Sequence, residues 1–334
     1  MLKSDNTDSI FLSPETVKRL ARDVRQILKS PLTSNGIYYH HDEDNLLKGY
    51  AMIIGPSETV YENGFYFFEF NYPHDYPSTP PTVTFRTNQD GIRFNPNLYT
   101  TGKVCISLLN TWRGEQWTSC QSISTILLTL CTLFTNEPLL NEPGVERRHR
   151  DFKTYNRIIE YANIDIAIFN IIEKSPKIYM PWFDMFYSDA LSSFKENLSS
   201  IKQNIENIVK RNKSYVQNDD TVATISIYRK SLRLDYNNVI TRFNNLYKKH
   251  SNSEQLKSWK PIPTIEIVKA EKRDQNEMLT LLDQLIGDTK PSEETFNSII
   301  PIPPTPKKMK KIARTKKIVI KKKTVEKEKE KSVN

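Results

Sequence analysis

The sequence is short of the residues on which several common sites depend. Only 9 of its 334 residues are glycine, and they form no glycine-rich loop that would cradle a nucleotide phosphate. Its three cysteines, Cys105, Cys120 and Cys131, include no C-x-x-C pair, and an odd number cannot all pair with one another. With no secretory leader at its start, the chain is predicted to be intracellular, in a reducing compartment.

Long hydrophobic runs are missing as well. The longest apolar stretches, 123–134 and 164–172, fall short of the ~20 residues that a membrane span needs, so no membrane association is expected.

Basic charge is concentrated at one end. The formal net charge is +9, but residues 307–334 hold 13 Lys and Arg against 3 Glu, or 13 − 3 = +10, which leaves 9 − 10 = −1 for the rest. A Lys-rich segment without aromatic residues is predicted to be disordered. It is a candidate contact for acidic partners or nucleic acid and a candidate nuclear signal, whereas the body of the protein is not predicted to bind nucleic acid.

The first element is predicted to be a helix. Ser13 is placed to cap it, and Pro14 takes the first helical position, where a missing N–H costs nothing. An apolar face follows, formed by Val17, Leu20, Ala21, Val24, Ile27 and Leu28. Four basic residues lie mostly on the other side, Lys18, Arg19, Arg22 and Arg25.

Four short strands are predicted next, separated by turn signals that suit an antiparallel meander. They span 36–39, 47–54, 64–70 and 82–86, and the proline-rich segment 72–81 must cross the end of the sheet as a loop. A helix over 121–134, capped by Thr118 or Ser119, is predicted to be the central buried one. Its apolar residues are Ile123, Ile126, Leu127, Leu130 and Phe134, widened by Leu128 and Cys131.

The second half is predicted to be helical. Helices are expected over 145–173 and 232–250, and between them Leu191, Phe194, Leu198, Ile201, Ile205 and Ile208 repeat at spacings of three and four. This repeat suits either a coiled-coil seam or an ordinary helix packed on its own domain. Proline-containing linkers at 260–263 and 301–306 enclose one further predicted helix over 278–286.

Cys105 is the leading candidate for chemistry. It follows a turn-rich approach that contains Asn95, Pro96, Asn97 and Gly102. A thiolate can carry an acyl group as a thioester that an amine then attacks, and the oxyanion formed on the way needs a fixed donor. Asn97 is placed to be that donor. A lone cysteine is otherwise a small buried hydrophobe, so the case depends on the surrounding pattern.

That pattern resembles the catalytic core of the ubiquitin-conjugating enzymes. The resemblance covers 13–144 and includes Asn95-Pro96-Asn97, Gly102, Cys105 and Trp117 in order, preceded by Gly55-Pro56, the turn at 62–64 and the proline-rich segment 72–81. It implies an α+β, ubiquitin-conjugating fold with an N-terminal helix, a four-stranded antiparallel meander, a central helix after the cysteine, an all-helical extension and a disordered basic tail. The expected division is 1–12 flexible, 13–175 catalytic core, 176–250 helical extension, 251–306 linker with a short helix, and 307–334 tail.

The likeness also implies a function. The chain would accept ubiquitin or a ubiquitin-like protein from an activating enzyme as a thioester on Cys105, with Asn97 as the oxyanion or loop-ordering asparagine, and pass it to a substrate lysine. ATP would be used by the activating enzyme, and no cofactor or metal is expected on this chain. The alternatives are a catalytically silent scaffold or adaptor of the same fold, or an adaptor that works through its basic tail. A cysteine hydrolase is disfavoured because no imidazole is evident beside Cys105, the nearest in sequence being His74.

The sequence departs from the family pattern at several points. Asn95 stands where the family usually has histidine, and the loop containing 110–116 is longer than usual. Both features resemble a subgroup of large, atypical members. Ser78 and the run 118–120 replace residues that normally contact ligases, so the ligase, if any, stays open.

The resemblance implies two further functional roles, and for each of them a solvated surface group without a role is the alternative. Glu142 lies near the position of an acid that helps to deprotonate the incoming lysine, and a solvated loop carboxylate is equally compatible. The basic face of the first helix, Lys18, Arg19, Arg22 and Arg25, would contact the activating enzyme, or is simply solvated.

A metal site at His40 and His41 is not favoured. Adjacent residues on a strand end point in opposite directions, so a surface turn with Asp42, Glu43 and Asp44 is the simpler interpretation.

Overall fold

The computed structural model describes residues 12–175, 180, 182–218 and 220–267. The predicted helix over 278–286, the linker at 301–306 and the basic tail 307–334 lie outside the described residues.

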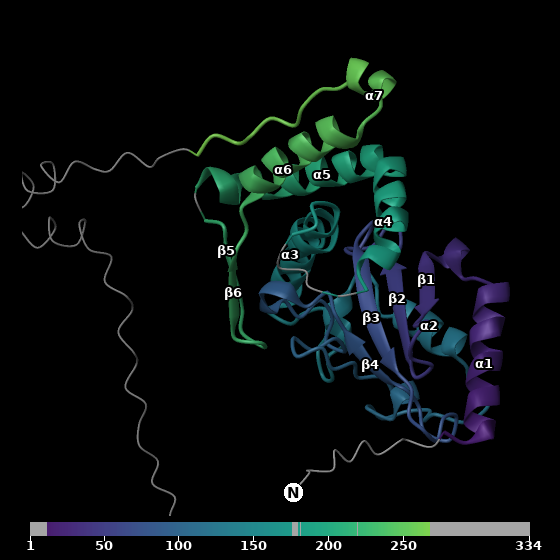
Figure 1. Ribbon diagram of the computed structural model, residues 1–334. Helices are drawn as coiled ribbons and strands as arrows, with labels where there is room; N and C mark the ends of the chain where they lie inside the picture. Colours follow the sequence, from purple (N-terminus) through teal and green to yellow (C-terminus); the bar gives the residue numbers. More distant parts are fainter. Residues whose placement is uncertain (1–11, 176–179, 181, 219, 268–334) are drawn as a thin grey trace, which may run out of the picture. The chain divides into compact units, whose positions relative to one another are not determined.

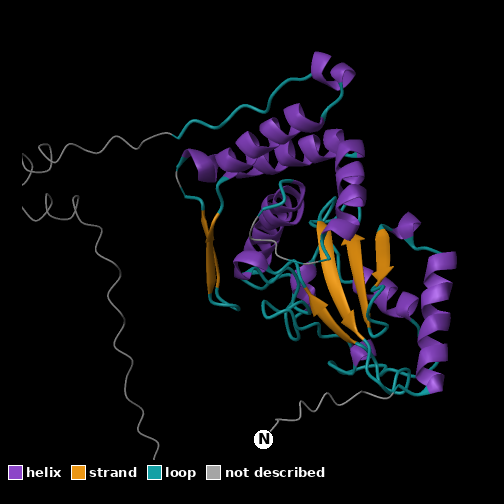
Figure 2. Cartoon of the chain, viewed as in Figure 1, coloured by secondary structure: helices purple, strands orange, loops and turns teal. Residues whose placement is uncertain are grey.

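A four-stranded antiparallel sheet organises the first half of the chain, as predicted (Figures 1 and 2). Its strands, in spatial and sequence order, are β1 Ile37–His41, β2 Lys48–Ile54, β3 Phe65–Asn71 and β4 Thr82–Phe85. Met52 pairs with Tyr38 on one side and with Phe67 on the other. The two central strands are buried on both faces, which is why they are continuous aromatic and aliphatic runs rather than alternating ones.

Four 3₁₀ turns shape the loops around this sheet. They are η1 Thr33–Asn35, η2 Gln89–Gly91, η3 Ser107–Leu109 and η4 Pro138–Asn141. In the sequence, η3 begins two residues after Cys105, and η4 ends at the residue before Glu142.

Helix α1 (Pro14–Lys29) begins where the sequence predicts, because the Ser13 side chain accepts a hydrogen bond from the Thr16 N–H. Its buried face is only partly the predicted one, because Leu20 and Ile27 are buried and Val24 packs against the core as expected, but other residues differ. The residues that pack inward are Thr16, Leu20, Asp23 and Ile27, whereas Val17, Ala21 and Leu28 are exposed. The face is rotated because a buried carboxylate, Asp23, finds partners inside the protein.

Those partners are Arg19 and Tyr76. The Arg19 guanidinium lies 2.9 Å from the Asp23 carboxylate, and the Tyr76 hydroxyl donates to the same carboxylate at 2.6 Å. Arg19 also donates to the carbonyls of Ser119 and Gln121. Arg19, predicted to lie on an outer basic face, is therefore an internal cross-link between α1 and the segment before α2.

Replacing Asp23 tests this cross-link. Asp23→Ala leaves a half-buried guanidinium and a buried phenol without their acceptor, so the free energy of unfolding measured in urea should fall by about 3–5 kcal/mol. Asp44→Ala, at an exposed turn position, is the matched control and should change stability by less than about 0.5 kcal/mol. Similar values for the two variants would show that the cross-link contributes little.

Helix α2 (Ile123–Cys131) is the central buried helix, but it starts later than predicted. Its cap is Ser122, which exchanges hydrogen bonds with Thr125 in a capping box, rather than Thr118 or Ser119. Leu128 is exposed and does not widen the buried face.

Helix α3 (Phe152–Ala162) continues into a π-helix, η5 (Asn163–Asn170), within the predicted helical range. The Asn163 side chain accepts a hydrogen bond from the Tyr66 hydroxyl at 2.5 Å and donates to the Glu62 carbonyl at 2.9 Å. This pair of bonds ties the helical layer to the β2–β3 turn and to β3.

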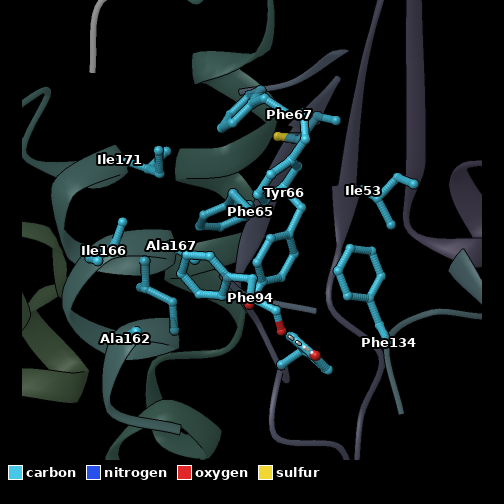
Figure 3. Packing of buried hydrophobic residues seen from close by; sticks show 14 of the residues in the cluster. Ile53, Phe65, Tyr66, Phe67, Phe94, Phe134, Ala162, Ile166, Ala167 and Ile171 are labelled. Atoms are coloured by element: carbon cyan, nitrogen blue, oxygen red, sulfur yellow. Dashed lines mark hydrogen bonds between the residues drawn. The ribbon is translucent and has the colours of Figure 1, made fainter. Parts of the chain in front are cut away.

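Figure 3 shows the apolar contact between sheet and helix. Aromatic rings from β3 and the following loop, Phe65, Tyr66, Phe67 and Phe94, lie beside small and branched side chains of α3, of η5 and of the residue after η5. These side chains are Ala162, Ile166, Ala167 and Ile171, and Phe134 lies on the other side of Tyr66. The rings of Tyr66 and Phe134 stack with centroids 4.5 Å apart. The sheet and the following helical segment therefore share one core.

The apolar repeat after residue 190 belongs to that packed body. It is divided between α4 (Asp184–Glu196) and α5 (Leu198–Gln217), which meet at Asn197. Phe194, Leu198, Ile201, Ile205 and Ile208 are at most 2% exposed. A helix packed on its own domain is thus the correct interpretation, rather than a seam open to a second chain.

The prediction of an all-helical extension is wrong. Residues after α5 form an antiparallel hairpin, β5 (Val222–Ile225) and β6 (Lys230–Arg233), and only then α6 (Tyr236–His250), which starts later than the predicted 232. The hairpin was missed because its turn contains no glycine, asparagine or proline.

A short helix, α7 (Ser253–Lys257), follows, and the next residues pack on α6. Asn244 and Asn237 of α6 each exchange two hydrogen bonds with the backbone, at Ile262 and Ile265 respectively. The part of the predicted linker up to residue 267 is therefore attached to the body through α6. The predicted division at residue 175 stays a prediction.

Within the ranges that the structure describes, no helix combines the length and the apolarity needed to cross a membrane.

Candidate functional site

Cys105 lies beneath the loop that follows it. The residue is 4% exposed, and its Sγ donates to the carbonyl oxygen of Thr111 at 2.9 Å. The Thr111 hydroxyl in turn accepts from the Ile106 N–H and donates to the Val104 carbonyl, each at 3.0 Å. The longer loop noticed in the sequence therefore folds back over the sulfur, and Asn110, with φ 56°, makes the turn that allows it.

Asn97 is joined to Cys105 by two hydrogen bonds. The Cys105 N–H donates to the Asn97 carbonyl at 2.9 Å, and the Asn97 side-chain amide donates to the Cys105 carbonyl at 2.5 Å. The structure thus brings together the two residues that the sequence placed at the centre of the site. In this arrangement the Asn97 amide is bonded to the backbone of the cysteine loop.

The side chain of Asn95 forms a hydrogen bond with the backbone of Asn97. It is fully buried, its side-chain oxygen accepts from the Asn97 N–H at 2.9 Å, and its amide donates to the Leu133 carbonyl at 2.9 Å. The bond from the Asn97 N–H to the Asn95 side chain closes a local turn, in which an asparagine side chain accepts from the backbone two residues further along. An asparagine at this position therefore joins the cysteine loop to the end of α2.

A second layer of side chains holds the Asn95–Asn97 loop. The Asn141 amide donates to the Asn95 side-chain oxygen at 3.3 Å, and the Arg93 guanidinium donates to the Pro96 carbonyl. The Arg93 guanidinium also lies over the rings of Tyr99 and Tyr228, 4.0 and 4.5 Å from their centroids.

Glu142 is half-buried, and its carboxylate has two partners in the protein. Its carboxylate accepts from the Tyr228 hydroxyl at 2.5 Å and lies 3.9 Å from the Arg93 guanidinium. In the described part of the chain no hydrogen bond or ion pair links Glu142 directly to Cys105 or Asn97. Its link to them runs through the neighbouring residue, Asn141, which contacts Asn95. A freely solvated loop carboxylate is therefore not what the structure shows.

A groove of about 520 Å³ opens beside the cysteine loop. It is lined by 79–84, by 101–104 and by 109–111, so it combines the end of the proline-rich loop, the residues before Cys105 and the start of the long loop after it. Gly102 forms part of this wall with φ 91°, and a side chain there would clash with Phe85 and Thr84.

Ser78 and residues 118–120, which replace the family's usual ligase-contacting residues, form one exposed region. Ser78 and residues 118–120 are all exposed, and the Trp117 indole joins the two segments by donating to the Pro77 carbonyl at 2.7 Å. The region offers polar side chains and the exposed thiol of Cys120.

Of the predicted basic face of α1, Lys18, Arg22 and Arg25 are exposed, and Arg19 is not available to a partner. Three basic side chains thus stay on the outer surface of the helix.

The histidine pair ends strand β1, where His40 pairs with Tyr50 and His41 with Gly49, and the predicted turn begins at Asp42. His41 bonds to the Tyr39 hydroxyl and the Leu46 carbonyl through its two ring nitrogens, and Asp42 accepts from the N–H groups of Asp44 and Asn45. Both histidine nitrogens are occupied by protein atoms. A search of the described residues finds no cluster of three metal-ligating side chains.

Four side chains of the site were not identified from sequence, namely Arg93, Thr111, Asn141 and Tyr228. Asn141 is the residue directly before Glu142, which the sequence did identify as a candidate. Tyr228 lies in a turn without the usual turn residues, more than 120 positions after Cys105, so no spacing rule connects it to the cysteine.

Comparison with known proteins supports the resemblance to the ubiquitin-conjugating enzymes that the sequence motifs indicate. Residues 19–162 match the family model described as ubiquitin-conjugating enzyme. The chain is similar to ubiquitin-conjugating enzyme E2 Z of Xenopus tropicalis, 33% identical over 249 residues that cover 74% of this chain and 75% of the relative. The human protein of that name is 40% identical over 173 residues, 51% of this chain and 48% of the relative, so this chain spans about half of the human protein's length.

Two further similarities cover a smaller share of the chain. The human dual E2 ubiquitin-conjugating enzyme/E3 ubiquitin-protein ligase BIRC6 is 41% identical over 143 residues, 40% of this chain and 3% of that protein. A solved structure of human ubiquitin-conjugating enzyme E2 G1 matches with 29% identity and a TM-score of 0.32, covering 37% of this chain and 98% of the other.

Proposed function

Since the chain belongs to the ubiquitin-conjugating enzyme family, we propose that it accepts ubiquitin or a ubiquitin-like protein as a thioester on Cys105 and transfers it to a lysine. The observation that carries the proposal is the network Asn95–Asn97–Cys105, in which the residue with the only buried thiol of the described residues has both its N–H and its carbonyl bonded to Asn97.

The chemistry has two acyl transfers. In the first, the Cys105 thiolate attacks the carbonyl carbon of a thioester held by the activating enzyme, and the activating enzyme's sulfur leaves as a thiolate. In the second, a neutral lysine amine attacks the new thioester, an amide bond forms, and the Cys105 sulfur leaves. ATP is spent by the activating enzyme, before either step.

The buried position of the sulfur sets a condition for the first step. The bond from Sγ to the Thr111 carbonyl must break, and the loop over 110–116 must move aside, before an acyl group reaches Cys105. The groove beside 101–104 and 109–111 is the route that a flexible C-terminal peptide of the modifier would take to the sulfur.

Glu142 is proposed to act in the second step. A lysine ammonium cannot attack a carbonyl, so a carboxylate near the approach path helps by accepting a hydrogen bond from the amine and favouring loss of its proton.

The exposed basic residues of α1 are proposed to meet an acidic surface of the activating enzyme. Reversing the charge of Lys18, Arg22 and Arg25 together should slow the first transfer by roughly tenfold at low salt, with a smaller effect at high salt, because contacts between exposed charges are screened. The measurement is the initial rate of thioester formation at several salt concentrations.

A matched control reverses the same number of charges elsewhere, in α5 and α7, at the exposed Lys210, Lys213 and Lys257. Equal losses in the two triple variants would mean that net charge, rather than a contact at α1, sets the rate.

The test of the function is charging followed by a lysine chase. The full chain is incubated with activating enzyme, ATP and a panel of ubiquitin and ubiquitin-like proteins, and free lysine is then added. An adduct that reductant removes and lysine discharges supports the proposal. An adduct that forms but never discharges would favour the silent scaffold. No adduct with any modifier would refute the enzyme assignment.

The basic tail is proposed to be an address or anchor, for a nuclear destination or for acidic partners, and is not needed for either transfer. Charging and discharge should be unchanged when residues 307–334 are removed.

A further inference from the structure

The tip of the β5–β6 hairpin is fixed to the beginning of α3. The N–H groups of Ser226 and Ile227 both donate to one carboxylate oxygen of Asp151, at 2.9 and 2.8 Å. Asp151 is 4% exposed, and Lys230 adds a bond from its ammonium to the Asp90 carbonyl at 3.0 Å. Because the tip is held at both ends of its turn, the side chains between these anchors have a defined position.

One of those side chains, Tyr228, reaches the candidate site. Its hydroxyl donates to the Glu142 carboxylate at 2.5 Å, and its ring lies against the Arg93 guanidinium, 4.5 Å from the ring centroid. Arg93 in turn holds the Pro96 carbonyl. A single residue of the hairpin therefore touches both the candidate acid and the side chain that supports the Asn95–Asn97 loop.

The electrostatics keep Tyr228 a donor. Burial, and then its hydrogen bond to Glu142, raise the pKa of Tyr228, whereas Arg93 lowers it and Tyr99 raises it. The charged and titratable groups that face Glu142 are Arg93, Tyr155 and Tyr228. At neutral pH the phenol therefore carries its proton, and the carboxylate accepts.

We propose that Tyr228 is a positioning residue, which fixes Glu142 and the Asn95–Asn97 loop for transfer to lysine and so makes the C-terminal extension part of the catalytic apparatus. The role in transfer rests on the function proposed above. The positioning itself does not, because it is a property of the folded chain.

The first test compares Tyr228→Phe with Tyr187→Phe in the full chain. Tyr187 is the matched control, because its hydroxyl also donates from the extension, to the Ile172 carbonyl at 3.0 Å, but away from the site. Backbone hydrogen exchange is measured at 93–98 and 139–142. Tyr228→Phe should speed exchange there about tenfold, since a hydrogen bond to a charged group is lost, and Tyr187→Phe should not. Unchanged exchange in Tyr228→Phe overturns the proposal.

The second test measures discharge of the preformed thioester to free lysine. The preformed thioester of Tyr228→Phe should be discharged roughly tenfold more slowly than that of the wild-type chain near neutral pH. The deficit should shrink as the pH approaches the lysine pKa of ~10.4, where the amine loses its proton unaided. A loss that is the same at every pH would indicate general damage and would contradict the positioning of Glu142.

A double variant completes the test. If Tyr228 acts through Glu142, Tyr228→Phe combined with Glu142→Gln should discharge no more slowly than Glu142→Gln alone, and fully additive losses would overturn the proposal. If the wild-type chain forms no thioester at all, the proposed function fails, and the exchange measurement still decides whether Tyr228 positions the loop.

Discussion

Cys105→Ala is expected to abolish the reductant-sensitive adduct completely, because no other group of the site can form a thioester. The substitution removes only a sulfur from a small buried side chain, so the fold should be retained, with no more than a small fall in the urea unfolding midpoint. The measurement is non-reducing electrophoresis after incubation with activating enzyme, ATP and the modifier that charges the wild-type chain.

Two controls sharpen this experiment. Cys120→Ala and Cys131→Ala should charge normally, although Cys120 is the more exposed thiol, because neither is held by the Asn95–Asn97 loop. Cys105→Ser should give at most a slowly formed ester that resists thiol reductants. An adduct on Cys105→Ala that reductant still removes would place the chemistry on another cysteine.

Asn97→Ala is expected to lower the rates of both charging and discharge by about 100-fold, the size of effect seen when one fixed donor is removed from an acyl-transfer site. The reason lies in the hydrogen bond from its side-chain amide to the Cys105 carbonyl, because the second bond, from the Cys105 N–H to the Asn97 backbone carbonyl, is kept in the variant. Loss of the amide leaves the Cys105 carbonyl without its donor and loosens the loop that holds the sulfur. The measurements are single-turnover rates of the two transfers.

Asn88→Ala is the matched control, since its amide also donates to a loop carbonyl, that of Thr100, at 2.9 Å, but not to the cysteine loop. It should leave both rates unchanged. If Asn97→Ala slows discharge while charging stays normal, ordering of the cysteine loop is not the main role of Asn97.

The sheet and the cysteine loop could be predicted because local signals dominate there. The four strands are bounded by turns built from Gly, Pro and Asn, and the bond from Asn95 to the Asn97 N–H is a local turn that any Asn-Pro-Asn run favours. The Ser13 cap of α1 is local in the same sense.

What could not be predicted depends on contacts between distant residues. The inward face of α1 is set by Asp23, whose partner Tyr76 is 53 positions away. From periodicity alone, a carboxylate such as that of Asp23 is expected on the solvent-facing side of the helix. Only its tertiary partner shows that it is buried in the protein. The hairpin could not be predicted because Lys230–Arg233 carries no strand signal of its own and is defined by pairing with Val222–Ile225. The partners of Glu142 were missed for the same reason, since Tyr228 lies 86 residues further along the chain.

Intact-mass spectrometry of the charged wild-type chain, with the linkage site mapped, tests the central claim most directly. The account predicts one modifier per chain, joined through its C-terminal carbonyl to the sulfur of Cys105 and released by reductant or by free lysine. A modifier attached to a lysine from the start, or to Cys120 or Cys131, or no adduct with any modifier tested, would contradict it.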